Sequence, residues 1–152
     1  MEEHDFGILL GLAYQAFKAE LHRALGAAGF DDVKPSFGFV FRALDRGPYT
    51  ASQLAALLDI SNPGGTKIVG EMVAAGYVER VPDPADGRAR PLHLTPRGRA
   101  ALATVRRFHA DFERRLAGEH GTERVATVRA VLAGYLDQAG AEPELARSLR
   151  PL

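Results

Sequence analysis

Cysteine is missing from the 152-residue chain. Its absence excludes disulfide bonds, thiolate metal sites and cysteine-based redox switches. Also lacking is any apolar run near the roughly 18 residues that a membrane-spanning helix needs. The acidic start, residues 1–5, is unlike a signal or transit peptide. We therefore expect a cytoplasmic protein that has no membrane partner.

The chain has no excess of charge of either sign, since 19 basic residues balance 19 acidic ones. A neutral total counts against nucleic-acid binding unless basic charge is concentrated locally. One stretch is locally basic, because residues 88–99 contain no acid and four arginines: Arg88, Arg90, Arg97 and Arg99. The acids gather elsewhere, at residues 2–5, 31–32 and 142–144.

Strand signals are limited to two short segments, residues 77–81 and 91–95, which alternate with period two. Residues 82–88 between them are dense in turn-forming types. The pattern predicts a β-hairpin with a charged tip.

The segments before the hairpin have helical periodicity. A first helix repeats apolar residues at three- and four-residue steps until residues 26–32 break it; these are Phe6, Leu10, Ala13, Phe17, Leu21 and Ala24. A second helix is expected from Pro35 to the break at Gly47-Pro48, with Phe37, Val40, Phe41 and Leu44 on its apolar face.

Two short helices around a tight turn come next. Thr50 and Gln53 have the spacing of a capping box, and Leu54, Leu57 and Leu58 form the apolar face of the first helix. After Asp59-Ile60, Ser61 is a good N-cap and Pro63 suits the first helical turn. The second helix is expected to bury Ile68, Val69, Met72 and Val73 and to end at Gly76.

A long helix follows the hairpin, capped by Thr95 and opened by Pro96. Its apolar residues form a coiled-coil-like seam of Leu102, Val105, His109, Phe112 and Leu116. A break is expected at residues 118–121, and then a last helix that carries Val125, Val128, Leu132 and Tyr135. Residues 141–152 either add one helical turn or are mobile.

The order of these elements predicts a mainly α (α+β) fold, a winged helix-turn-helix with a two-stranded β-wing. In such a unit the capped second helix lies in the major groove, and its free backbone N–H groups attract phosphates. The hairpin brings arginine to the minor groove or the DNA backbone.

Residues 86–98 read Asp-Gly-Arg-Ala-Arg-Pro-Leu-His-Leu-Thr-Pro-Arg-Gly. This stretch matches the wing signature D-x-R-x-x-x-x-x-L-T-x-x-G of the bacterial MarR regulators. Residues 61–69 and 74–80 resemble the recognition helix of that family and its exit into the first wing strand. The resemblance spans residues 6–139, nearly the whole chain.

The resemblance implies a single domain over residues 1–152, with a DNA-binding lobe at 35–95 and dimerisation helices at 3–28 and 96–140. It places Asn62, Pro63, Gly64, Thr66 and Lys67 at the major groove, while Ser61 and Thr66 could contact phosphate. From the wing, Arg88 and Arg90 would reach the DNA, and Asp86 would hold an arginine in place. The expected partner is double-stranded DNA with a pseudo-palindromic operator, bound by a homodimer.

Four residues of the recognition helix depart from the family pattern. Gly64 and Gly65 stand where relatives carry side chains, and each weakens the helix by up to about 1 kcal/mol relative to alanine. Gly70 and Glu71 occupy positions that are often charged or basic in relatives, and the Glu71 carboxylate would repel a nearby phosphate. These differences bear on base specificity more than on DNA binding itself.

Relatives often bind small aromatic or phenolic compounds where the dimerisation helices meet the DNA-binding lobe. The residues that would bind such an effector here are Tyr14, Phe39, Tyr49, Phe108 and Phe112. The alternative is that these rings simply belong to the hydrophobic core. Phe37 and Phe41 share one helical face, whereas Phe39 points in a different direction. Phe39 is therefore the better candidate for a residue that lines an effector pocket.

We expect no metal, no cofactor and no catalytic residues. The five histidines are scattered without ligand spacing, so His109 is expected to pack in the helix seam. Gly-rich phosphate loops and nucleophile elbows are missing from the sequence. The favoured hypothesis is a dimeric repressor released by a small-molecule effector; the alternative is a winged-helix protein-interaction module without direct DNA binding.

Overall fold

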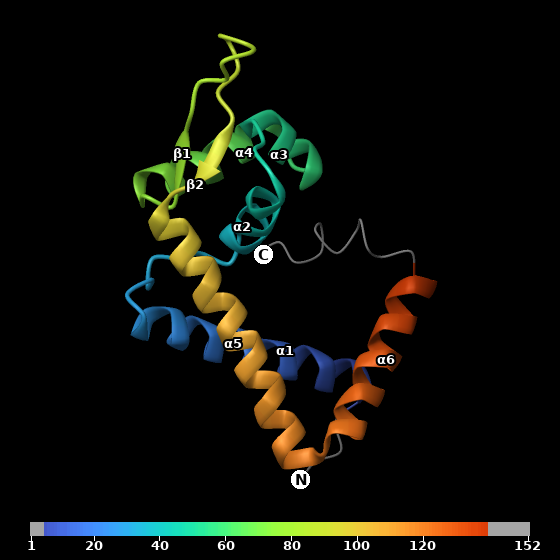
Figure 1. Ribbon diagram of the computed structural model, residues 1–152. Coiled ribbons are helices and arrows are strands. Elements are labelled where there is room, and N and C mark those ends of the chain that lie inside the picture. The colour runs from blue at the N-terminus through green and yellow to red at the C-terminus, as the bar shows by residue number, and fades with distance from the viewer. Residues whose placement is uncertain (1–4, 140–152) are drawn as a thin grey trace. The chain divides into compact units, whose positions relative to one another are not determined.

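The computed structural model describes residues 5–139, which form six helices and a two-stranded hairpin in the expected order (Figure 1). The prediction of a mainly helical winged fold is therefore confirmed. The prediction for residues 141–152 lies outside the described residues. None of the described helices is long and apolar enough to cross a membrane. The chain divides into two compact units, residues 1–33 and 34–152.

The first unit consists of helix α1 (Phe6–Ala27) and the turn after it. Gly29 adopts a positive φ of 85°, and the N–H groups of Gly29 and Phe30 donate to the carbonyls of Gly26 and Leu25. This is a Schellman motif, which satisfies carbonyls that the helix end leaves without partners. The expected break at Gly26 thus begins slightly later, since α1 extends to Ala27.

The second unit begins with α2 (Phe37–Arg46), followed by the helix-turn-helix of α3 (Ala51–Leu57) and α4 (Asn62–Ala74). Both predicted caps are present. The Thr50 hydroxyl accepts from the Gln53 N–H in a complete capping box, and the Ser61 hydroxyl accepts from the Gly64 N–H at 3.1 Å. Leu57 differs from the prediction, because its side chain faces solvent rather than the core.

Schellman motifs also end α3 and α4. Ile60 and Asp59 donate to the carbonyls of Ala55 and Ala56, and the same pattern joins Tyr77 and Gly76 to Met72 and Val73. The residue with positive φ is Asp59 (49°) after α3 and Gly76 (78°) after α4. These turns fix the direction in which the chain leaves each helix.

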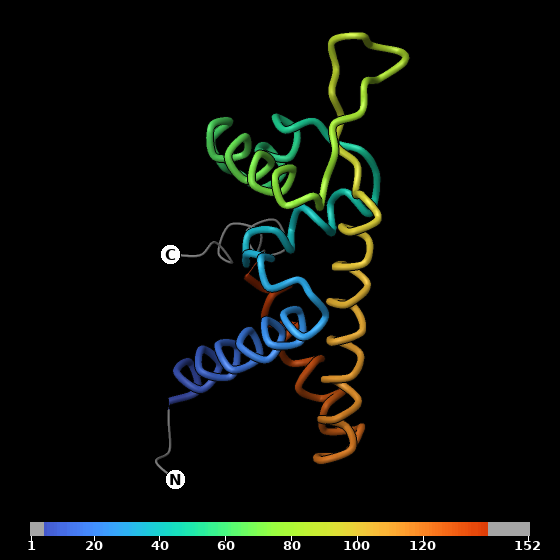
Figure 2. The backbone as a smooth tube through the Cα atoms, turned by 90° about the vertical axis from the view of Figure 1, so that its left-hand side faces the viewer, coloured from blue at the N-terminus to red at the C-terminus, as the bar shows by residue number. Residues whose placement is uncertain are grey.

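The wing is an antiparallel pair, β1 (Val78–Arg80) and β2 (Leu92–Leu94), with Glu79 opposite His93. Its connecting loop extends beyond the helices of the lobe (Figures 1 and 2). A third backbone segment joins the base of the wing, since the Leu92 N–H donates to the Tyr49 carbonyl at 2.8 Å. This bridge was not predicted from the sequence.

The core of the second unit lies under the wing. Tyr77 is completely buried and makes edge-to-face contacts with Phe37 and Phe41, at centroid distances of 6.1 and 5.5 Å. Aromatic pairs favour this geometry. Leu54 of α3 and Met72 of α4 are buried as well. The predicted faces of α2 and α4 thus form the core that supports the recognition helix.

Helix α5 (Pro96–His120) is the long helix that descends from the wing in Figure 2, and α6 (Thr122–Gln138) packs against it. Thr95 caps α5 as predicted, with its hydroxyl accepting from the Gly98 N–H. The predicted break at 118–121 is narrower than expected, because the helix continues through Gly118 and ends at Gly121 (φ 93°).

Candidate nucleic-acid interface

The N-terminus of α4 presents an open polar surface. The capping residue Ser61 and the first-turn residues Asn62 and Pro63 are exposed, as are Thr66 and Lys67 one turn later. Gly64 is half-buried beside the Ser61 hydroxyl. Free N–H groups at such a helix end attract anions. The predicted groove-facing residues therefore share one accessible helix end.

Gly65 has a different role from its neighbour, because it is buried where α3 crosses α4. A Cβ at this position would lie 2.7 Å from the Ala55 Cβ and 3.3 Å from the Ala51 carbonyl oxygen. The glycine therefore permits the close approach of the two helices. From the sequence alone Gly65 is only a weak helix former, because its neighbours on α3 are distant in sequence.

Glu71 does not stand as an isolated charge on α4. Its carboxylate pairs with the Lys34 ammonium at 2.9 Å, and its side chain is only 30% exposed. The ion pair joins α4 to the segment before α2. The Lys34 ammonium therefore compensates the negative charge of Glu71, which the sequence alone did not reveal.

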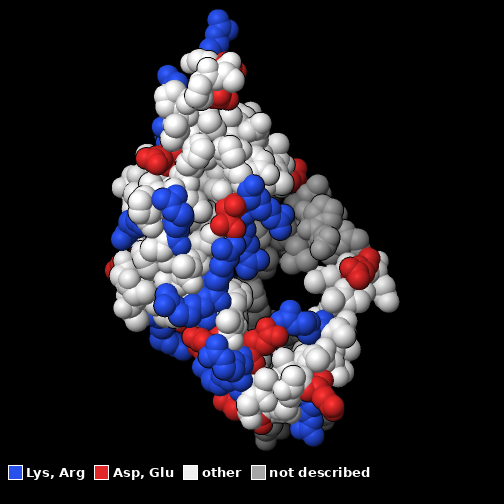
Figure 3. All heavy atoms as spheres, in the orientation of Figure 1, with Lys and Arg blue, Asp and Glu red and all other residues white. Residues whose placement is uncertain are grey.

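In the wing, acidic side chains organise the loop. The Asp83 carboxylate accepts from the Ala85 N–H at 2.8 Å, and the Asp86 carboxylate accepts from the Arg88 N–H at 3.0 Å. Asp86 thus contacts the backbone of Arg88. The side chains of Arg88 and Arg90 are exposed, and Figure 3 shows basic atoms at the tip of the hairpin. Both arginines are accessible to a polyanion.

The other two arginines of the acid-free stretch bind the protein itself. Arg97 donates from Nε to the Ala75 carbonyl at 3.2 Å, and Arg99 donates from Nη1 to the Leu94 carbonyl at 2.7 Å. In the sequence, all four arginines contribute to the local basic charge. The structure separates them into two at the wing and two with contacts inside the lobe.

The lobe built from these elements can be compared with known proteins. A family model described as MarR family matches residues 32–89, from the segment before α2 into the wing loop. The match covers the helix-turn-helix and the start of the wing, which is less than half of the 152-residue chain. A comparison with curated proteins gives no match.

Three solved structures of bacterial proteins share the fold. Reduced MarR from E. coli is 23% identical, with a TM-score of 0.68, and the match covers 90% of this chain and 99% of that one. RV1404 from Mycobacterium tuberculosis is 19% identical, with a TM-score of 0.72 and coverage of 90% and 96%. A MepR mutant from S. aureus, bound to an oligodeoxyribonucleotide, is 17% identical, with a TM-score of 0.65 and coverage of 90% and 99%.

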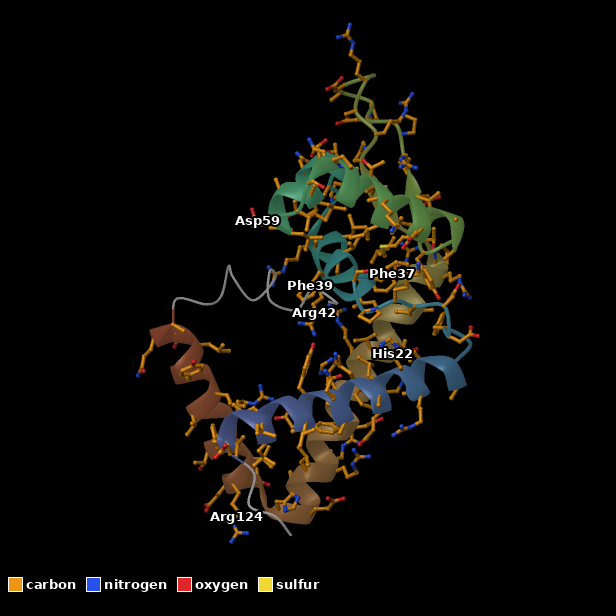
Figure 4. All side chains as sticks on the ribbon, turned by 180° about the vertical axis from the view of Figure 1, so that it is seen from behind. His22, Phe37, Phe39, Arg42, Asp59 and Arg124 are labelled. Atoms are coloured by element: carbon orange, nitrogen blue, oxygen red, sulfur yellow. The ribbon has the colours of Figure 1, made fainter. Side chains whose placement is uncertain are left out.

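The predicted effector residues lie in several places. Phe108 and Phe112 are half-buried on α5, with ring centroids 6.0 Å apart. Phe39 is half-buried on α2 beside Arg42, on the side away from α3 and α4 (Figure 4). Tyr49 lies at the base of the wing through its bridge to Leu92. Tyr14 belongs to α1, where the Lys18 ammonium lies 4.9 Å from its ring centroid.

His109 lies in the predicted seam of α5. Burial lowers the pKa of its imidazole, and the nearby Arg42 guanidinium lowers it further. The neutral form is thus favoured in the folded protein. Among residues 5–139, no three histidine, aspartate or glutamate side chains gather as metal ligands.

Proposed function

We propose that this chain is a sequence-specific DNA-binding regulator that acts as a homodimeric repressor and is released by a small-molecule effector. Its recognition helix is α4, with Ser61, Asn62, Pro63, Gly64, Thr66 and Lys67 at the major groove. Its wing contributes Arg88 and Arg90, with Asp86 ordering the turn. The DNA-binding lobe covers residues 35–95, and the helices within 3–28 and 96–140 form the dimer.

The observation that carries the DNA proposal is the exposure of two separate basic elements on one winged helix. The capped end of α4 has Lys67 on its second turn, and the wing loop carries two exposed arginines, Arg88 and Arg90. A helix end of this kind reads base edges, while a wing contacts phosphate or the minor groove. Only Ala89 stands between the two arginines in the sequence, and residues 88–99 contain no acid.

Exposed apolar side chains support the homodimer. On α1 six large apolar residues are at least 40% exposed: Phe6, Ile8, Leu9, Leu10, Leu12 and Tyr14. On α6 the exposed ones are Val128, Val131, Leu132 and Tyr135, and this helix has no buried residue. Apolar surface on this scale is unfavourable in water unless another surface covers it. A second copy of the chain would bury both helices.

Support for an effector comes from half-buried aromatic rings on two packed helices, Phe39 on α2 and Phe108 and Phe112 on α5. An aromatic compound that stacks on such rings would gain dispersion and hydrophobic contact. Release from DNA requires that the compound bind one conformation of the dimer more tightly than the other. The two conformations would differ in the spacing of the recognition helices.

A fluorescence-anisotropy titration tests the proposal. The protein is titrated against duplex DNA from upstream of its own gene and against a scrambled duplex, each at two salt concentrations. Tight, salt-sensitive binding that prefers the upstream duplex is expected. If preference is lacking, selection from random-sequence DNA follows; a protein that enriches no sequence would contradict the proposed function and favour a protein-interaction module.

A further inference from the structure

Three parts of the lobe meet at one point: the C-terminal end of α4, the base of the wing and the first turn of α5. Resting on the proposed DNA-binding function, we infer that Arg97 is a positioning residue at this joint. Its guanidinium fixes the direction of the recognition helix relative to α5, and it thereby sets DNA affinity without contacting DNA.

The contacts of Arg97 span the joint. Its Nε donates to the Ala75 carbonyl, the C-cap of α4, and its Nη2 donates to the Tyr77 hydroxyl, each at 3.2 Å. The guanidinium carbon also lies 4.8 Å from the centroid of the Tyr77 ring. A planar guanidinium can make these contacts together, whereas an ammonium cannot reproduce the fork and the stacking.

Neighbouring contacts make the joint stiff. The Thr95 hydroxyl donates to the Gly76 carbonyl and accepts from the Gly98 N–H, so one side chain caps α5 and holds the end of α4. The Thr95 N–H donates to the Tyr77 carbonyl at 3.1 Å. Gly98 is buried, and a Cβ there would lie 2.1 Å from the Tyr77 carbonyl oxygen. The two chain segments therefore approach as closely as their backbones allow.

The position of the joint separates it from the DNA-facing surface. Helix α4 has 13 residues, so its axis is about 20 Å long at 1.5 Å per residue. The carbonyl that Arg97 binds lies at the end opposite the Ser61 cap. A small rotation of α4 at this end displaces the groove-facing residues at the other end. Loss of the Arg97 contacts is therefore expected to change DNA affinity, although Arg97 does not contact the DNA.

The test compares Arg97→Lys and Arg97→Met with the same changes at Arg107, an exposed arginine of the same helix. Dissociation constants are measured for specific and scrambled DNA over a series of salt concentrations, below the thermal transition of every variant. Both Arg97 variants are expected to weaken specific binding about tenfold. The slope of log Kd against log salt is expected to match that of the wild type, because no phosphate contact is lost. The Arg107 variants should bind as the wild type does.

The Tyr77 hydroxyl supplies a second check. Tyr77→Phe should weaken specific binding by a smaller factor, and it should have little further effect in the Arg97→Met background, since the contact is already absent. Specific affinity should fall more than scrambled-DNA affinity, which a loss of folded protein alone would not produce.

Several results would overturn the inference. Arg97→Lys with wild-type affinity, or Arg97→Met with a salt slope reduced by about one, would identify a phosphate contact instead. Equal losses for specific and scrambled DNA would indicate a purely structural role. If the wild-type protein binds no DNA, the proposed function fails and this inference with it. If the wild type binds and the Arg97 variants match it, only the inference fails.

Discussion

At Asp59 the backbone between α3 and α4 has a positive φ of 49°, which disfavours residues with a Cβ. Asp59→Gly is expected to raise the free energy of unfolding by about 0.5 kcal/mol, after allowance for the greater freedom of glycine in the unfolded chain. Urea denaturation at fixed protein concentration measures the change. Asp59→Asn removes the charge alone, so a similar gain in that variant would contradict the backbone explanation.

Two glycines of α4 give opposite predictions for the same substitution. Gly65→Ala should lower the free energy of unfolding by about 1–3 kcal/mol, because the new methyl group would overlap Ala55 and force α3 away from α4. Gly70→Ala should raise it by up to about 1 kcal/mol, because nothing lies within 4 Å of its Cβ position. Equal effects in the two variants would disprove the packing role of Gly65.

Local chemistry explains which residues the sequence could place. The caps at Thr50, Ser61 and Thr95 depend on neighbours within three positions, and all three are present. Arg97 and Gly65 act on residues about 10 or 20 positions away, and the sequence carries no local trace of those contacts. The roles of Arg97 and Gly65 can be recognised only in the folded structure, which brings their partners close to them.

At the scale of elements, α2 and α5 meet beside His109. The pKa of this imidazole is lowered by burial first and by Arg42 second. The unfolded chain takes up the proton at about pH 6.5, so it binds more protons than the folded protein just below that value. Stability should therefore fall as the pH drops from 7 through this window.

His109→Gln should flatten that pH dependence, since glutamine keeps a polar side chain without a proton to gain. Urea midpoints measured from pH 7.5 to 5 for both proteins provide the comparison. An undiminished slope in the variant would assign the pH dependence to other groups.

Periodicity placed every helix and both wing strands, since apolar spacing and caps are properties of short segments. It did not place the Tyr49 bridge, because a backbone hydrogen bond to Leu92 depends on the path of the chain between them. The prediction from periodicity was also wrong for Leu57, which follows the apolar pattern of α3 but is exposed to solvent. The short helix turns that residue away from the core.

At the scale of the whole molecule, the exposed apolar face of α6 predicts self-association. Val131→Asp should weaken the dimer more than about tenfold, because an unpaired carboxylate would be buried in the interface. Leu57→Asp is the matched control, since Leu57 is 52% exposed and Val131 is 60% exposed. Sedimentation equilibrium measures the dissociation constant. An unchanged constant for Val131→Asp would exclude this face from the dimer.

A two-fold dimer would place two recognition helices about one helical turn of DNA apart, roughly 34 Å. The sequence indicated a dimer through the resemblance of its wing and recognition helix to a known family and, independently, through the coiled-coil-like seam of α5. Nothing in a single chain's periodicity states what covers α1 and α6.

The salt dependence of DNA binding in Arg88→Ala tests the central claim most directly, with Arg107→Ala on α5 as a control of equal charge change. Anisotropy titrations with the selected duplex over a salt series give both affinity and slope. The account predicts that Arg88→Ala weakens binding by about 1–3 kcal/mol and reduces the salt slope by about one, while Arg107→Ala changes neither. Unchanged binding by Arg88→Ala would contradict the wing's role in DNA recognition.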